Sequence, residues 1–217
     1  MSWLLVLPVL YGASMALATP SLLRVLPAPV DEPDADPYRP LATPGVAIAV
    51  FLLVTAAGMV VVTVAPRHTP TWLGLVGPAV LAAVVDARTT YLPRPLAQAS
   101  LLLTTAGMLA TTAWLGAEPL LRGALGALAS GALFWLFWRL GGGFGFGDVR
   151  LAPVIGAASA AVSWSLLAGA LLLGSLLGVA WGVVWRASGR GRQFPYGPAL
   201  VAGPFLALTA SALVPSG

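Results

Sequence analysis

The stretch LAPVIGAASAAVSWSLLAGALLLGSLLGVAWGVVW occupies residues 151–185 and contains no charged side chain. Arg150 and Arg186 flank it on either side. A transmembrane helix needs about 20 largely apolar residues, so this stretch is too long for one span and predicts two helices that meet near Ser163. The first of them, at 149–162, is short, and its length is compatible either with a full span or with a re-entrant segment.

The rest of the chain has the same apolar character. Hydrophobic residues make up 59% of the sequence, charged residues 8%, and the mean hydropathy is +0.92, whereas a soluble domain carries about 25% charged residues. Further uncharged stretches predict helices at 2–23, 43–65, 70–85, 95–115, 120–138 and 197–214. The sequence therefore predicts an all-α polytopic integral membrane protein with about eight transmembrane helices, forming a single membrane-embedded domain over 1–217.

The arginines predict the orientation. All 11 basic residues are arginines, and they occur singly between apolar segments, which is typical of membrane topology rather than of nucleic-acid binding. Eight crossings from an outside N-terminus leave only Arg67 and Arg122 outside. The others then face the cytoplasm: Arg24, Arg39, Arg88, Arg94, Arg139, Arg150, Arg186, Arg190 and Arg192. This bias predicts a multi-pass protein of the cytoplasmic membrane, and we expect the first apolar segment to be retained, since it lacks the basic start of a signal peptide.

One segment differs in composition from the membrane helices. Residues 24–42 are rich in proline and hold four of the seven acidic residues, namely Asp31, Glu32, Asp34 and Asp36. Such a composition does not support a packed core. We therefore expect a flexible cytoplasmic loop here.

Two other acidic residues lie beside apolar spans. Asp86 and Asp148 both fall at cytoplasmic helix ends in the predicted topology, whereas Glu118 falls in an outer turn. Ionisable groups in membrane helices are costly and are usually functional, and two converging carboxylates are the minimum that aspartic proteolysis requires. Two structural alternatives stay open: Asp86 could pair with Arg88, and Asp148 could cap a helix that begins at Val149.

A glycine run precedes the second aspartate, with Gly145 and Gly147 closest to it. Glycine allows a backbone to approach a ligand closely, as a substrate strand beside a carboxylate would require. A nucleotide-binding loop is disfavoured, because no strand precedes the run. A simple hinge between two helices is the structural alternative.

Three motifs resemble those of one family. Gly145-Phe146-Gly147-Asp148-Val149-Arg150-Leu151 resembles the GxGD signature of type IV prepilin peptidases, with arginine in place of the usual lysine. Asp86 to Pro93 resembles the D-x6-P stretch around the first aspartate of that family, although Arg94 follows where Asn or Asp is common. Phe194-Pro195-Tyr196-Gly197-Pro198 is similar to the PFGP-like segment before the last helix.

The resemblance implies a membrane-embedded aspartic endopeptidase that cleaves the N-terminal leader of prepilins or pseudopilins at the cytoplasmic membrane face. It implies that Asp86 and Asp148 are catalytic and that Gly145, Gly147 and Pro93 shape the backbone around the substrate. No cofactor is implied. The expected partners are the prepilin substrate and membrane lipid, and the oligomeric state stays open. The resemblance also implies that the substrate is an apolar helical segment preceded by a short cytoplasmic leader, which is usually basic in this family.

One feature of many members is absent. The chain has no cysteine, whereas many relatives carry paired CxxC motifs in a larger first loop that is associated with N-methylation of the new pilin terminus. We therefore expect a minimal form that lacks methyltransferase activity. The single histidine, His68, lies in a predicted outer turn, so the sequence predicts no metal site.

Three alternative functions are compatible with parts of this pattern. The first is a presenilin-like GxGD protease with another substrate. The second is a secondary transporter that uses the aspartates as proton or cation sites, although transporters usually contain repeats and hold such groups near the membrane midplane. The third is a membrane scaffold without activity, in which both aspartates would be replaceable.

Overall fold

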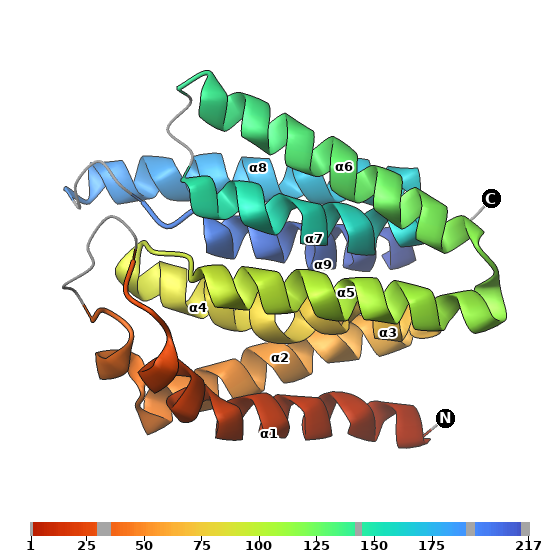
Figure 1. Ribbon diagram of the computed structural model, residues 1–217, viewed down its shortest axis with the longest axis horizontal. Helices are drawn as coiled ribbons and strands as arrows, with labels where there is room; N and C mark the ends of the chain where they lie inside the picture. The colour runs from red at the N-terminus through yellow and green to blue at the C-terminus, as the bar shows by residue number, and fades with distance from the viewer. Residues whose placement is uncertain (1, 30–35, 142–144, 190–193, 214–217) are drawn as a thin grey trace.

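The computed structural model describes residues 2–29, 36–141, 145–189 and 194–213, and the regular elements of these ranges are helices (Figure 1). Six long helices are continuous: α1 (Ser2–Val25), α2 (Pro44–Val64), α5 (Arg94–Leu115), α6 (Glu118–Arg139), α8 (Trp164–Ala187) and α9 (Gly197–Leu213). The central helix α7 covers Phe146–Val162. A further rod is formed by α3 (Thr69–Gly74), the π-helical turn η3 (Leu75–Ala79) and α4 (Val80–Thr89). Two short 3-10 helices, η1 (Arg39–Leu41) and η2 (Pro66–His68), precede α2 and α3.

Every apolar stretch identified in the sequence forms a helix, which confirms the all-α membrane fold. Six helical segments of the described residues are long and apolar enough to cross a membrane: Leu5–Val25, Pro44–Val64, Pro66–Thr89, Arg94–Leu115, Glu118–Arg139 and Trp164–Ala187. Helices α7 and α9 have 17 residues each, or about 26 Å of helix. The described part of the chain is therefore that of a polytopic membrane protein.

The long uncharged stretch breaks at the predicted position. Ser163 has an extended backbone (φ −164°, ψ 157°), and its Oγ accepts a hydrogen bond of 3.0 Å from the Leu166 N–H at the start of α8. Helix α7 does not turn back before this break, because Asp148 lies in its first turn and the carbonyl of Ala161, in its last turn, accepts a 3.2 Å hydrogen bond from Arg122 near the start of α6. Helix α7 thus runs from one end of the bundle to the other.

The two ends of the bundle are distinct. We call the end that holds Asp86 and Asp148 the aspartate end, and the end that holds His68 the histidine end. The chain enters at the histidine end with α1, and α9 finishes there, on the right in Figure 1. Successive long helices run in opposite directions, so the last turn of α4 and the first turns of α7 and α9 meet at the aspartate end.

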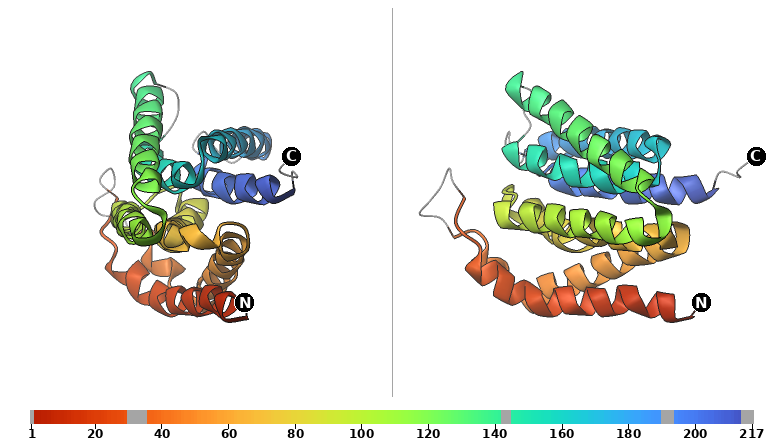
Figure 2. Two further views of the ribbon diagram at one scale, coloured as in Figure 1. Left: turned by 90° about the vertical axis from the view of Figure 1, so that its right-hand side faces the viewer. Right: turned by 45° about the vertical axis from the view of Figure 1, so that its right-hand side comes forward.

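Helix α7 forms the centre of the bundle. It packs against α5, α6, α8 and α9, and Figure 2 shows these helices around it. At its crossing with α6, a Cβ on Gly156 would collide with the carbonyl of Gly126, and the reverse is also true. Such small residues allow membrane helices to approach closely. On the outside, leucines such as Leu102 (71% exposed) and Leu128 (70%) are positioned to face lipid.

The rod that carries Asp86 is irregular in its middle. The π-helical turn η3 contains Pro78, which has no N–H and interrupts helical hydrogen bonding. The carbonyl of Leu73 instead accepts a 2.9 Å hydrogen bond from the Tyr11 hydroxyl of α1. Backbone groups in a membrane need an internal partner, so α1 stabilises the irregular rod from the side.

Parts of two expectations fall outside the described residues. Three acidic residues of the predicted flexible loop at 24–42, namely Asp31, Glu32 and Asp34, lie outside the described residues. Gly142 and Gly143, in the glycine run before Asp148, also lie outside them. In the described remainder of the segment at 24–42, α1 extends to Val25, η1 covers Arg39–Leu41, and Tyr38 is only 2% exposed.

Candidate functional site

Asp86 lies in the last turn of α4 and is almost buried, with 5% exposure. Its Oδ2 accepts a 2.8 Å hydrogen bond from the backbone N–H of Gly197, the first residue of α9. The first N–H groups of a helix have no partner within that helix and bind anionic groups well. No ion pair joins Asp86 to Arg88 in the described structure, and Arg88 is exposed. The predicted alternative of an Asp86–Arg88 pair is therefore wrong.

Asp148 lies in the first turn of α7 and has 6% exposure. The helix begins at Phe146, so Asp148 is its third residue, and its N–H donates to the carbonyl of Gly145 at 3.1 Å. Gly145 occupies the capping position. The alternative in which Asp148 caps a helix starting at Val149 is therefore wrong, and the Asp148 carboxyl instead has a backbone hydrogen bond with Gly145, the residue before the helix.

The helix ends that carry the two carboxylates meet at the aspartate end. One side chain, Leu92, links the three segments around them. A Cβ on Gly147 would lie 2.7 Å from the Leu92 Cβ, and a Cβ on Gly197 would lie 3.3 Å from its Cδ1. Three stretches therefore converge on one site: the stretch from Asp86 to Pro93, the stretch from Gly145 to Asp148, and the stretch at 194–198 around the start of α9. They are also the three motifs singled out from the sequence.

The two glycines before Asp148 differ in their surroundings. Gly147 needs to be a glycine for steric reasons, because a Cβ there would press on Leu92 close to its backbone. Gly145 has an extended conformation (φ −70°, ψ 147°) that any residue adopts, and an added Cβ would lie at an ordinary 3.6 Å from Asp148 Oδ2. Neither glycine requires a positive φ, so close packing explains Gly147 better than backbone freedom does.

This difference predicts the outcome of alanine substitutions. We expect Gly147→Ala to reduce any activity of the site about 10-fold or more, because displacement of about 1 Å at a reacting group can cost about 10²-fold. Gly145→Ala is expected to lose less. Gly45→Ala is the control, since nothing lies within 4 Å of an added Cβ there. Equal loss in Gly145→Ala and Gly147→Ala, measured as turnover per folded protein, would contradict this account.

Pro93 lies at the end of the segment that connects α4 to α5. It is buried, and with φ −63° and ψ 123° it stands immediately before α5. Thr90 ends α4 in the left-handed conformation (φ 60°), and its N–H donates to the carbonyl of Asp86 at 2.7 Å. This conformation is uncommon for a β-branched residue. It turns the chain sharply after Asp86, so that Leu92 and Pro93 can return to the site.

Two tyrosines near the aspartates were not predicted as site residues. Tyr38 is buried, and this burial, together with the nearby Tyr91 and Asp86, raises its pKa from 10.0 to about 12. Burial also raises the pKa of Tyr196, as does the nearby Asp148, while the Ser175 hydroxyl at 3.5 Å opposes the shift. Both phenols therefore stay protonated at neutral pH beside the carboxylates. Only Tyr196, within the motif at 194–198, had a signal in the sequence.

Gly197 contacts Asp86, which the motif at 194–198 did not specify. A Cβ added to Gly197 would lie only 2.8 Å from Asp86 Oδ2, so the close approach of the α9 backbone to this carboxylate requires glycine.

The described residues contain no group of three or more His, Asp or Glu side chains arranged to hold a metal ion. His68 lies at the opposite end of the bundle, in η2.

The arrangement brings two acids together in a largely desolvated place. Two carboxyl groups that lie close together can share one proton between them. The ionised member can take a proton from water, while the protonated member can donate a hydrogen bond to a carbonyl oxygen. The site therefore contains the groups needed for hydrolysis of a peptide bond.

Comparison with known proteins gives one match. No curated protein and no solved structure shows significant similarity to the chain. Residues 73–183, just over half of the chain, match the type IV leader peptidase family, and this range contains Asp86, Pro93, Gly145, Gly147 and Asp148. The chain belongs to the type IV leader peptidase family.

Proposed function

We propose that this protein is a membrane-embedded aspartic endopeptidase that removes the N-terminal leader of prepilins or pseudopilins. Asp86 and Asp148 are its catalytic pair. The observation that carries the proposal is the presence of two nearly buried carboxylates at the same end of the bundle, one of them held by the Gly197 N–H at 2.8 Å. Membership in a peptidase family argues against the transporter and scaffold alternatives.

The proposed reaction follows from the shared proton. The ionised aspartate removes a proton from a water molecule, which attacks the scissile carbonyl, while the protonated aspartate stabilises the developing oxyanion. Collapse of the tetrahedral intermediate breaks the C–N bond, and a carboxyl group transfers a proton to the leaving amine. The products are the leader, with a new carboxylate, and the mature pilin, with a free amino terminus.

The arginine distribution supports cleavage at the cytoplasmic face. Most described arginines lie in segments at the aspartate end: Arg24, Arg39, Arg88, Arg94, Arg139, Arg150 and Arg186. Arg67 and Arg122 lie at the histidine end, where Arg122 pairs with Glu118 at 2.9 Å. Because positive charge favours the cytoplasmic side, we infer that the aspartate end is cytoplasmic and that the N-terminus is outside.

Co-expression tests the proposed activity. The chain is expressed with a prepilin in a bacterial host that lacks a leader peptidase, and the pilin is examined by gel mobility and mass spectrometry. The proposal predicts loss of the leader at one bond. An intact prepilin, together with cleavage of other membrane segments, would point instead to a GxGD protease with another substrate.

We predict that the mature pilin made by this chain alone carries an unmodified N-terminus. The expectation rests on the absence of cysteine from the sequence, and therefore of the paired CxxC motifs associated with methylation in the family. Mass spectrometry of the purified pilin distinguishes a free amino terminus from one that is about 14 Da heavier. An N-methylated terminus, with no other methyltransferase in the host, would refute the prediction.

A further inference from the structure

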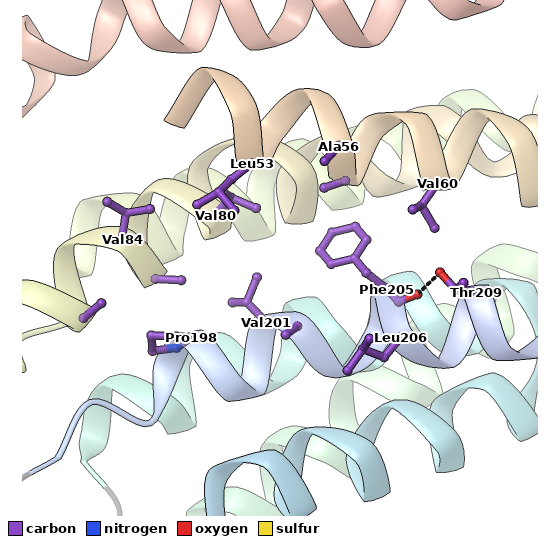
Figure 3. A pocket seen from close by; sticks show the side chains of 14 residues that line it. Leu53, Ala56, Val60, Val80, Val84, Pro198, Val201, Phe205, Leu206 and Thr209 are labelled. Atoms are coloured by element: carbon purple, nitrogen blue, oxygen red, sulfur yellow. Dashed lines mark hydrogen bonds between the residues drawn. The ribbon is translucent and has the colours of Figure 1, made fainter. Parts of the chain in front are cut away.

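An apolar groove runs along the bundle between α2, α4 and α9. Its volume is about 420 Å³, and Figure 3 shows its walls, with Val80 and Val84 of α4 and Leu53 of α2 facing Pro198 and Phe205 of α9. Each helix contributes residues at helical spacing, so one continuous stripe of each helix lines the groove. On α9 this stripe extends from Pro198 to Thr209, a length of about 16 Å.

One end of the groove lies next to Asp86 in the sequence of α4. Its residues at that end are Ala87 and Pro198, which directly follow Asp86 and Gly197. These last two residues are joined by the hydrogen bond that holds the Asp86 carboxylate. The groove therefore ends one residue from Asp86 along α4 and one residue from Gly197 along α9, and it leads away from the site toward the histidine end.

The chemistry of the groove restricts its occupant. Every lining residue is apolar except Thr209, whose hydroxyl already donates to the carbonyl of Phe205 at 2.9 Å. Such walls offer no partner for a headgroup, an ion or a polar peptide, and a charged group in membrane surroundings would be costly. Alanines on the groove, among them Ala56 and Ala202, leave the room that close packing of membrane helices requires.

We propose that this groove binds the apolar helical segment that follows the scissile bond of the substrate. The inference rests on the proposed function and adds to it the place where the membrane part of the substrate lies. The first three turns of that segment pack along the stripe of α9 between α2 and α4. The leader stays at the aspartate end, and the scissile bond is held at the junction of the two, beside Asp86.

Filling the groove tests the proposal. Ala56→Leu and Ala202→Leu introduce larger side chains at accessible positions of the groove, and Ala129→Leu, at an exposed position of α6, is the matched control. Each variant is reconstituted in liposomes and assayed on a full-length prepilin and on a short peptide that spans the cleavage site but lacks the apolar segment. We expect the groove variants to lose at least 10-fold in kcat/KM on the prepilin and less than 2-fold on the peptide, with no change in the control.

The outcomes separate the two proposals. If the wild-type chain cleaves neither substrate, the proposed function fails. If the wild type cleaves the prepilin and the groove variants cleave it equally well, the groove proposal fails and the proposed function stands. Equal losses on both substrates would also overturn the groove proposal, because they would indicate damage to the site rather than to docking.

Cross-linking gives a second measurement that does not depend on turnover. The chain contains no cysteine, so a single cysteine introduced as Ala202→Cys or Thr209→Cys is the only thiol. With a prepilin that carries thiol-reactive probes along its apolar segment, Ala202→Cys should react nearer the scissile bond than Thr209→Cys. The offset should be about seven residues, given the 1.5 Å rise of both helices. Reaction no greater than that of Leu102→Cys on the lipid-facing side of α5 would mean that lipid alone occupies the groove, and would overturn the proposal.

Discussion

Asp86→Asn and Asp148→Asn are each expected to reduce leader cleavage by at least about 10³-fold, since positioned general acids and bases contribute about 10²–10⁴-fold and neither aspartate can act alone. An amide is similar to a carboxyl in shape but cannot exchange the proton that the reaction requires. In Asp86→Asn, the side-chain oxygen can still accept from the Gly197 N–H, so the fold should be retained. Processing of a co-expressed prepilin, normalised to the amount of inserted protein, measures both effects.

The matched control is Asp36→Asn. Asp36 is exposed and accepts a 3.1 Å hydrogen bond from the Arg39 N–H in the segment before α2. The Asp36→Asn substitution removes one negative charge from the chain, as the two site substitutions do, but it leaves the site intact. Processing should therefore change less than 2-fold. Near wild-type processing by either Asp86→Asn or Asp148→Asn would contradict the paired mechanism.

Gly197→Ala is expected to have the second-largest effect. The new Cβ would lie 2.8 Å from Asp86 Oδ2 and 3.3 Å from its Cγ, so the carboxylate or the start of α9 has to move. Because a misplacement of about 1 Å at the reacting groups can cost about 10²-fold, we expect a loss of about that size in kcat. The fold should tolerate the change, since the contact is with the end of a side chain.

Two comparisons make this prediction specific. Gly45→Ala, at a position with open space around it, should leave processing unchanged. In the double variant Asp86→Asn with Gly197→Ala, the second substitution should have little further effect, because the group that it disturbs is already inactive. Additive losses in the double variant would show that Gly197 acts elsewhere, for example on the packing of Leu92.

The fold was predictable from the sequence because a membrane restricts the possible structures. Uncharged stretches of about 20 residues must form helices in lipid, and the structure has a helix at each of them. The break at Ser163 followed from the length of the uncharged stretch alone. The π-helical turn at Leu75–Ala79 was not predicted, because a proline in a helical pattern does not specify how the freed carbonyl is satisfied.

The site was predictable only in part. The motifs indicated Asp86 and Asp148, but the contacts of Leu92 with Gly147 and Gly197 join residues that are distant in sequence and depend on how helices pack. The burial of Tyr38 was missed for a related reason. The composition of 24–42 predicts a solvated loop, whereas one aromatic side chain within it packs into the core of the helical bundle. Composition describes the segment as a whole and does not identify the residue that anchors it.

The central claim is that this chain itself hydrolyses a prepilin leader with Asp86 and Asp148. The most direct test uses the purified protein in liposomes with a purified prepilin, and follows the released leader by mass spectrometry. The account predicts that the wild type releases an intact leader with a new carboxylate at its end, and that liposomes holding Asp86→Asn or Asp148→Asn release none above background. No leader from the wild type, or equal release from either asparagine variant, would contradict the account.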